Sequence, residues 1–143
     1  MNQLTRFRYD AVIQVGGAAP GLQEVPWLDW QRQKLSLDEI HARLTAEKPE
    51  VLAFRGIPNL RVDPETVASQ WLRAAEPGAT VAQLRAYLAG VPSTGVEPDR
   101  LAAVAAELGY RTELSWLNCG PEGAFDAELW RWGKGSRCAS AFP

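Results

Sequence analysis

Four carboxylates come nearest to a catalytic set in this sequence of 143 residues, and all four fall in its C-terminal third. They are Glu107, Glu113, Asp126 and Glu128. The last three lie on two segments that we expect to form a hairpin, so a carboxylate pair across that hairpin is one hypothesis for general acid–base chemistry. The spacing along the chain sets no distance between these groups. We therefore assign no catalytic residue.

The histidine and the two cysteines do not form a recognisable site in the sequence. His41 falls in the middle of an expected helix, with no serine, cysteine or carboxylate at a motif spacing, which favours a surface or packing role over that of a general base. Cys119 and Cys138 are too few for a disulfide framework, and no CxxC or HExxH spacing indicates a metal site. Cys138, beside Arg137 in a polar tail, is expected to be exposed and is a possible modification site.

Four helices are expected from their start signals. Ser36 and Glu39 form a capping box that opens a helix ending near Lys48. A second helix begins at residues 63–65, with Asp63 as N-cap, and we expect Val67, Trp71 and Leu72 to be its buried side. A third helix begins with the capping box of Thr80 and Gln83 and carries Leu84, Tyr87 and Leu88. A fourth begins at residues 97–99, buries Leu101, Val104, Ala105 and Leu108, and stops at Gly109.

Alternating or continuous apolar runs predict four strands. Residues 4–15 alternate apolar and polar side chains, residues 51–54 form a short apolar run, and residues 110–117 and 125–132 are joined by a loop at 118–123 as a hairpin. Residues 16–21 are expected to be a connector. The order predicts an α+β fold, in which a small mixed or antiparallel sheet carries about four packed helices. We expect one domain over residues 1–132 and a flexible tail over 133–143.

Several blocks of the sequence resemble a known family. They are Leu4-Thr5-Arg6-Phe7-Arg8-Tyr9-Asp10, Trp27-Leu28-Asp29-Trp30, Arg55-Gly56-Ile57-Pro58-Asn59-Leu60-Arg61, the run from Glu107 to Trp116, and the run from Gly123 to Glu128. In this order they resemble the C-terminal segment of the S-adenosylmethionine-dependent methyltransferase domain embedded in nonribosomal peptide synthetases. The resemblance covers residues 4–132. The half of that domain that binds the cofactor has no counterpart here.

The resemblance implies a segment that does not methylate by itself. A cofactor loop of this class needs a strand, a glycine-rich turn and a helix in succession. Gly16-Gly17 follows an expected strand, but Pro20 and the lack of a following helix argue against a cofactor loop. We therefore expect no bound cofactor and no independent methyltransferase activity.

Aromatic and basic side chains are the candidates for contact with a partner. Trp27 and Trp30 could form an aromatic platform, or both could cover the edge of the sheet. Trp130 and Trp132 share one face of the last strand, while Phe125 and Leu129 share the other. That strand is therefore either central in the sheet or covered by something outside this chain. Arg6, Arg8 and Arg131 could form a basic patch for an acidic carrier protein, or they could be a solvated face.

The bulk properties exclude some classes of partner. The net charge is -2 and the sequence pI is about 5.4, so no basic field favours nucleic acid. No apolar run is long enough to span a membrane, and residues 1–10 do not resemble a signal peptide. We expect a cytoplasmic protein.

Three functional hypotheses follow. The first is a non-catalytic binding or scaffold module of peptide natural-product biosynthesis, which docks to a synthetase, a carrier protein or a tailoring enzyme. The second is a ribosomal precursor whose folded leader, residues 1–132, presents a core peptide containing Cys138. The third is the substrate-side segment of a methyltransferase that works in trans with a separate cofactor-binding chain.

Overall fold

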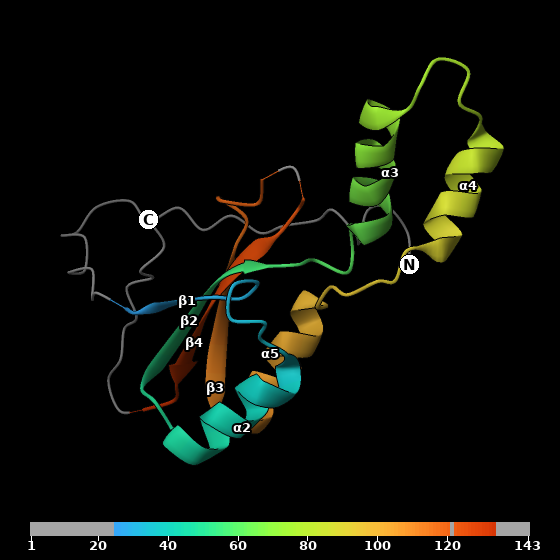
Figure 1. The fold of residues 1–143 in the computed structure, drawn as a ribbon. Helices are drawn as coiled ribbons and strands as arrows, with labels where there is room; N and C mark the ends of the chain where they lie inside the picture. The colour runs from blue at the N-terminus through green and yellow to red at the C-terminus, as the bar shows by residue number, and fades with distance from the viewer. Residues whose placement is uncertain (1–24, 121, 134–143) are drawn as a thin grey trace.

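The computed structural model describes residues 25–120 and 122–133, and within them four strands form one sheet with an α+β arrangement of helices (Figure 1). The expected strand at residues 4–15, the connector at 16–21 and the tail at 134–143 lie outside the described residues. The elements, in chain order, are β1 (Trp27–Asp29), α2 (Leu37–Glu47), β2 (Val51–Ile57), α3 (Asp63–Ala74), α4 (Val81–Gly90), α5 (Pro98–Glu107), β3 (Tyr110–Ser115) and β4 (Phe125–Arg131).

The sheet is mixed, with strand order β1-β2-β4-β3. β1 runs parallel to β2, whereas β4 is antiparallel to both β2 and β3. β4 is thus a central strand, and its residues from Phe125 to Trp130 are all buried. Of the two alternatives left open by the sequence, the first holds: β4 is a central strand, and side chains on both of its faces are buried, Asp126 and Glu128 included.

The main core lies between the sheet and two helices. α2 and α5 lie side by side against one face of the sheet (Figure 1). Ile40 and Leu44 of α2 and Leu101 of α5 pack there with Phe54 and Leu129 of the strands. Ser36 caps α2 as expected, because its hydroxyl accepts a hydrogen bond from the Glu39 backbone N–H and donates one to the Glu39 carboxylate. α5 also begins and ends where the sequence predicts.

A smaller apolar cluster covers the opposite face of the sheet. It joins Val25, Ala53 and Trp130, and the half-buried Trp27 and Val51 pack against it. The cluster places the predicted aromatic residue Trp27 at the β1 edge of the sheet. Within the described ranges, no helix has the length and apolar character needed to cross a membrane.

α3 and α4 form a helical hairpin that stands away from the sheet (Figure 1). The two helices contact each other, and among the residues that the structure describes neither helix has a buried side chain. The prediction that Val67, Trp71 and Leu72 form a buried side is therefore wrong. Among the described helices and strands the main contact of α3 is with α4. Val67 and Trp71 are half-buried there, and Leu72 is 61% exposed. The N-cap of α3 is Val62, one residue before the predicted Asp63.

A bulge makes β2 longer than the predicted strand at 51–54. The register with β4 shifts between Phe54 and Ile57, and Gly56 between them has φ of +69°. This left-handed conformation suits glycine, which has no Cβ to clash. β2 therefore continues through the bulge to Ile57, and the Gly56 backbone N–H turns toward Asp126, 2.9 Å from its Oδ1.

Candidate functional site

Large apolar side chains are exposed at three places on the described surface. Leu72, Val81 and Tyr87 lie on the helical hairpin, with exposed fractions of 61%, 64% and 49%. A second group is Trp116 and Leu117, just after β3, and the third place is Trp132, just after β4. Exposed apolar side chains gathered on one element indicate a contact surface more strongly than isolated ones do. The helical hairpin carries the largest of these groups.

The four predicted aromatic residues divide into buried and accessible positions. Trp30 and Trp130 are only 5% and 8% exposed, so neither ring is available to a partner. Trp30 packs edge-on against Phe54, with ring centroids 5.7 Å apart. This agrees with the alternative in which Trp30 covers the sheet and does not contact a partner. Trp27 is half-buried. Trp132 is 73% exposed, and its backbone N–H is held by the carbonyl of Gly109 at 2.9 Å.

The predicted basic patch is only partly within the described residues. Arg131 is exposed, and one of its guanidinium nitrogens donates to the backbone carbonyl of Lys48 at 3.3 Å. This bond ties the end of β4 to the end of α2. Arg6 and Arg8, like the possible modification site Cys138, lie outside the described residues. The patch as a whole stays a prediction.

The β3–β4 pair brings two of the four predicted carboxylates opposite each other, since Glu113 and Glu128 are partners in its register. Each has another contact. Glu113 forms an ion pair with Arg111 at 2.6 Å, and the fully buried Glu128 accepts a hydrogen bond from the indole N–H of Trp130 at 3.0 Å. Glu107 is exposed at the end of α5. These contacts give Glu113 and Glu128 structural partners within the fold.

Asp126 accepts hydrogen bonds from two separate segments of the fold. One carboxylate oxygen accepts the backbone N–H of Gly56 at 2.9 Å, and the other accepts the side-chain amide of Asn118 at 3.1 Å. Asp126 therefore joins the β2 bulge to the loop that follows β3. Its burial, at 5% exposure, is offset by these bonds.

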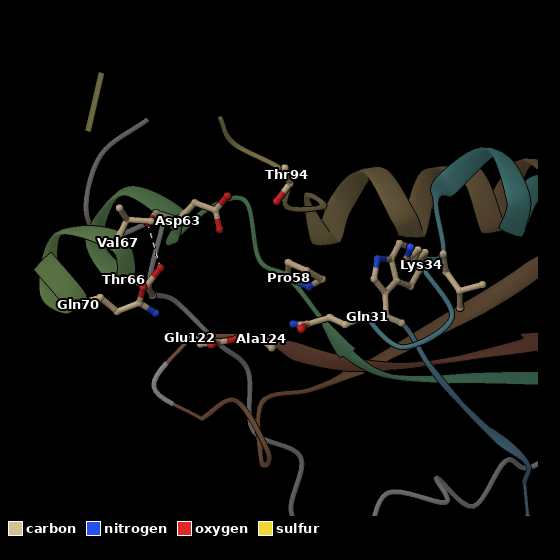
Figure 2. A pocket seen from close by; sticks show the side chains of 12 residues that line it. Gln31, Lys34, Pro58, Asp63, Thr66, Val67, Gln70, Thr94, Glu122 and Ala124 are labelled. Atoms are coloured by element: carbon tan, nitrogen blue, oxygen red, sulfur yellow. Dashed lines mark hydrogen bonds between the residues drawn. The ribbon is translucent and has the colours of Figure 1, made fainter. Parts of the chain in front are cut away.

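An open groove of about 590 Å³ lies between the helical hairpin and the sheet (Figure 2). Figure 2 shows Gln31 and Lys34 on one side of the groove and Thr66 and Gln70 of α3 on the other, with Glu122 near its floor. Amide, hydroxyl and charged groups of both signs could hydrogen-bond a polar ligand. Within the described ranges, no three His, Cys, Asp or Glu side chains are grouped to hold a metal ion.

Tyr110 is a titratable group whose pKa is perturbed by its place in the fold. Burial raises the pKa of Tyr110 above its usual 10.0, and the nearby positive charge of Arg131 partly opposes this rise. The phenol donates a hydrogen bond to the carbonyl of Pro49 at 2.8 Å. Tyr110 thus anchors the start of β3 to the chain that precedes β2.

Sequence reasoning missed the helical hairpin as a surface and missed the groove. The groove side chains come from separate segments and share no motif, so no sequence signal identifies them. The helical hairpin did leave a signal in the sequence, because Arg85 is the only charged residue among the ten residues of α4. A helix that is apolar on all sides is normally buried, so its exposure could have been recognised as unusual only once the fold was known.

The chain is similar to parts of two much longer proteins. Chondramide synthase cmdD of Chondromyces crocatus is 35% identical in an alignment of 129 positions that covers 87% of this chain and 3% of that protein. Nonribosomal peptide synthetase agiA of Aspergillus flavus is 26% identical over 149 residues, covering 95% of this chain and 2% of that protein. No protein-family model matches the chain. These similarities relate the chain to a segment of nonribosomal peptide synthetases.

Proposed function

We propose that this chain is a non-catalytic binding or scaffold module of peptide natural-product biosynthesis that docks to a synthetase. The observation that carries the proposal is the set of large apolar side chains left exposed on a chain related to synthetase segments. Covering a side chain such as Leu72 or Tyr87 would contribute about 1.5–3 kcal/mol when burial is complete. In both relatives the matching segment is a few per cent of the polypeptide, so the rest of the same protein is available to cover such side chains.

The roles of the carboxylates support a binding function over catalysis. Asp126 holds a bulge and a loop, Glu128 holds an indole, and Glu113 is paired with Arg111. Each group is used to stabilise the sheet. A general acid or base needs access to a substrate proton, which the buried positions of Asp126 and Glu128 disfavour.

The docking proposal is tested by reconstitution. The matching segment is removed from a stretch of chondramide synthase that includes the flanking polypeptide, and the present chain is then added. We expect the two to elute together in size-exclusion chromatography, with a dissociation constant in the micromolar range or below. The excised chondramide synthase segment is the matched positive control. If that segment binds again and the present chain elutes alone, the proposal is wrong.

A finer proposal is that the chain is the substrate-side part of a split methyltransferase. The motif resemblance supports it, and the relationship to synthetases is compatible with it. The chain alone is expected not to bind S-adenosylmethionine at millimolar concentration, whereas a mixture with a cofactor-binding chain would. Calorimetric titration of both samples measures this difference. Cofactor binding by the isolated chain would contradict the proposal.

The precursor hypothesis rests on the composition of residues 133–143, above all on Cys138. It predicts a mass change confined to that segment when the chain is recovered from its producer. Intact-mass and fragment-ion spectrometry distinguish the two proposals. The docking proposal predicts an unmodified segment.

A further inference from the structure

The helical hairpin stands on a clamped stem. The chain enters it through residues 58–62 and leaves it through residues 91–96. Two backbone hydrogen bonds join the sides: the N–H of Val96 donates to the Pro58 carbonyl at 2.7 Å, and that of Leu60 donates to the Val96 carbonyl at 3.2 Å. The Ser93 hydroxyl adds a bond of 2.9 Å to the Asp63 carboxylate. These bonds fix the direction in which the two helices project.

A glycine makes the clamp possible. A Cβ on Gly95 would lie 2.5 Å from the backbone nitrogen of Leu60 and 2.7 Å from its Cα. Such contacts are too short for any side chain, and they are with backbone atoms that cannot turn aside. The two sides of the stem therefore approach as closely as they do because residue 95 has no side chain.

The tip of the hairpin is also well formed. Thr80 and Gln83 make a complete capping box at the start of α4, in which each side chain bonds to the backbone N–H of the other residue. Gly78, with φ of +97°, makes the turn between the helices. α4 is therefore held in shape by local bonds, although it buries none of its side chains in the described structure.

The low charge of this element is confined to α4, whose single charged residue is Arg85, whereas α3 carries Asp63, Glu65 and Arg73. Leu72 of α3 and Val81 and Tyr87 of α4 expose 61%, 64% and 49% of their surface. A rigid element that presents apolar side chains loses little conformational entropy when it binds. Burial of apolar area, with little contribution from ion pairs, would provide the binding free energy.

We propose that the helical hairpin is the part of this chain that docks, and that its partner is an uncharged apolar face of a neighbouring domain in the synthetase polypeptide. The inference rests on the proposed function and assigns that function to α3 and α4. The choice of partner follows from the low charge of α4 and from the length of the relatives, in which the matching segment adjoins a far longer chain. A strongly acidic partner is not favoured, because α4 offers only Arg85 and the single arginine of α3, Arg73, shares that helix with the carboxylates of Asp63 and Glu65.

The test uses alanine substitutions on the exposed surface. Leu72→Ala, Val81→Ala and Tyr87→Ala are combined in one variant, since alanine keeps or improves helix propensity and none of the three residues is buried. The matched control combines His41→Ala and Glu107→Ala, which removes exposed side chains from α2 and α5, away from the helical hairpin. Circular dichroism checks that both variants stay folded. Binding to the chondramide synthase stretch without its own segment is measured at low salt and at about 1 M salt.

We expect the helical-hairpin variant to bind at least tenfold more weakly, the control to bind within about threefold of the unmodified chain, and salt to have little effect. If the unmodified chain binds and the helical-hairpin variant binds equally well, docking stands but the hairpin assignment is wrong. Binding that salt abolishes overturns the apolar partner. Dimerisation of the chain through Leu72, Val81 and Tyr87, seen by sedimentation, also overturns the inference. If the unmodified chain does not bind, both proposals fail.

Discussion

At the scale of single residues, Asp126 shows how a group suited to chemistry is used for structure. Its two carboxylate oxygens accept from the Gly56 backbone and the Asn118 amide, so it holds together two segments that are distant in sequence. The sequence identifies Asp126 as a carboxylate on a strand. It does not identify the acceptor role, because that role depends on a bulge in another strand.

Replacement of Asp126 by alanine is expected to lower the free energy of unfolding by about 2–3 kcal/mol, since the buried N–H of Gly56 would lose its acceptor. Asp126→Asn keeps one carbonyl oxygen and should cost less. Urea denaturation measures both effects. Glu122→Ala, which removes an exposed carboxylate from the loop that precedes β4, is the control and should change stability by less than about 0.5 kcal/mol. Equal effects of the Asp126 and Glu122 changes would contradict the role assigned to Asp126.

Tyr110 predicts a loss of stability at alkaline pH. Its pKa is raised in the folded state by burial, so above pH 10.0 the unfolded chain releases the phenolic proton while the folded chain retains it. The unfolded state then binds fewer protons, and the free energy of unfolding falls as pH rises. Tyr110→Phe should be about 1 kcal/mol less stable at neutral pH, because it lacks the bond to Pro49, and should lose less stability above pH 10.0. Parallel pH profiles of the two proteins would contradict this.

At the scale of elements, the two capped helices α2 and α4 differ in how much of their stability comes from contacts beyond the cap. α2 buries Ile40 and Leu44, whereas α4 relies on its cap and on contact with α3. Thr80→Ala should therefore reduce amide protection at the start of α4 by about fivefold with little change in global stability. Ser36→Ala should lower global stability by about 1 kcal/mol. Hydrogen exchange and urea denaturation measure the two effects, and a global loss caused by Thr80→Ala would be inconsistent with an independent hairpin.

Two glycines of the hairpin region provide a matched pair. Gly95→Ala should destabilise by about 2 kcal/mol or more, because the new Cβ meets the Leu60 backbone and opens the stem. Gly90→Ala meets no atom within 4 Å at the end of α4, so it should be neutral or stabilising by up to about 1 kcal/mol. Thermal denaturation of both variants is sufficient. Equal destabilisation by the two changes would show that the stem is not closely packed.

Local signals predicted the elements whose ends depend on neighbouring residues. The capping residues Ser36 and Thr80, the stop at Gly109 and the alternation of β3 and β4 were all sufficient to place an element. The bulge at Gly56 and the three-residue strand β1 could not be predicted, because both depend on pairing with a distant strand. Pairing partners are not encoded in the periodicity of a single segment.

At the scale of the whole molecule, the candidate site was only partly predictable. Trp132, a predicted partner-contact residue, is exposed, whereas Trp30 and Trp130 lie in the interior because β4 is central and Trp30 packs on Phe54. An aromatic residue has the same sequence signature in a core and in an interface. The helical hairpin was assigned to the core for the converse reason: its apolar stripe is real, but no described part of the sheet covers it.

Docking of this chain to a synthetase through the helical hairpin can be located by hydrogen exchange. Exchange is measured on the chain alone and on the chain bound to the chondramide synthase stretch without its own segment. We expect new protection in Asp63–Ala74 and Val81–Gly90, with unchanged exchange in α2 and α5. Protection confined to the end of β4 at Trp132, or no change anywhere, would contradict it.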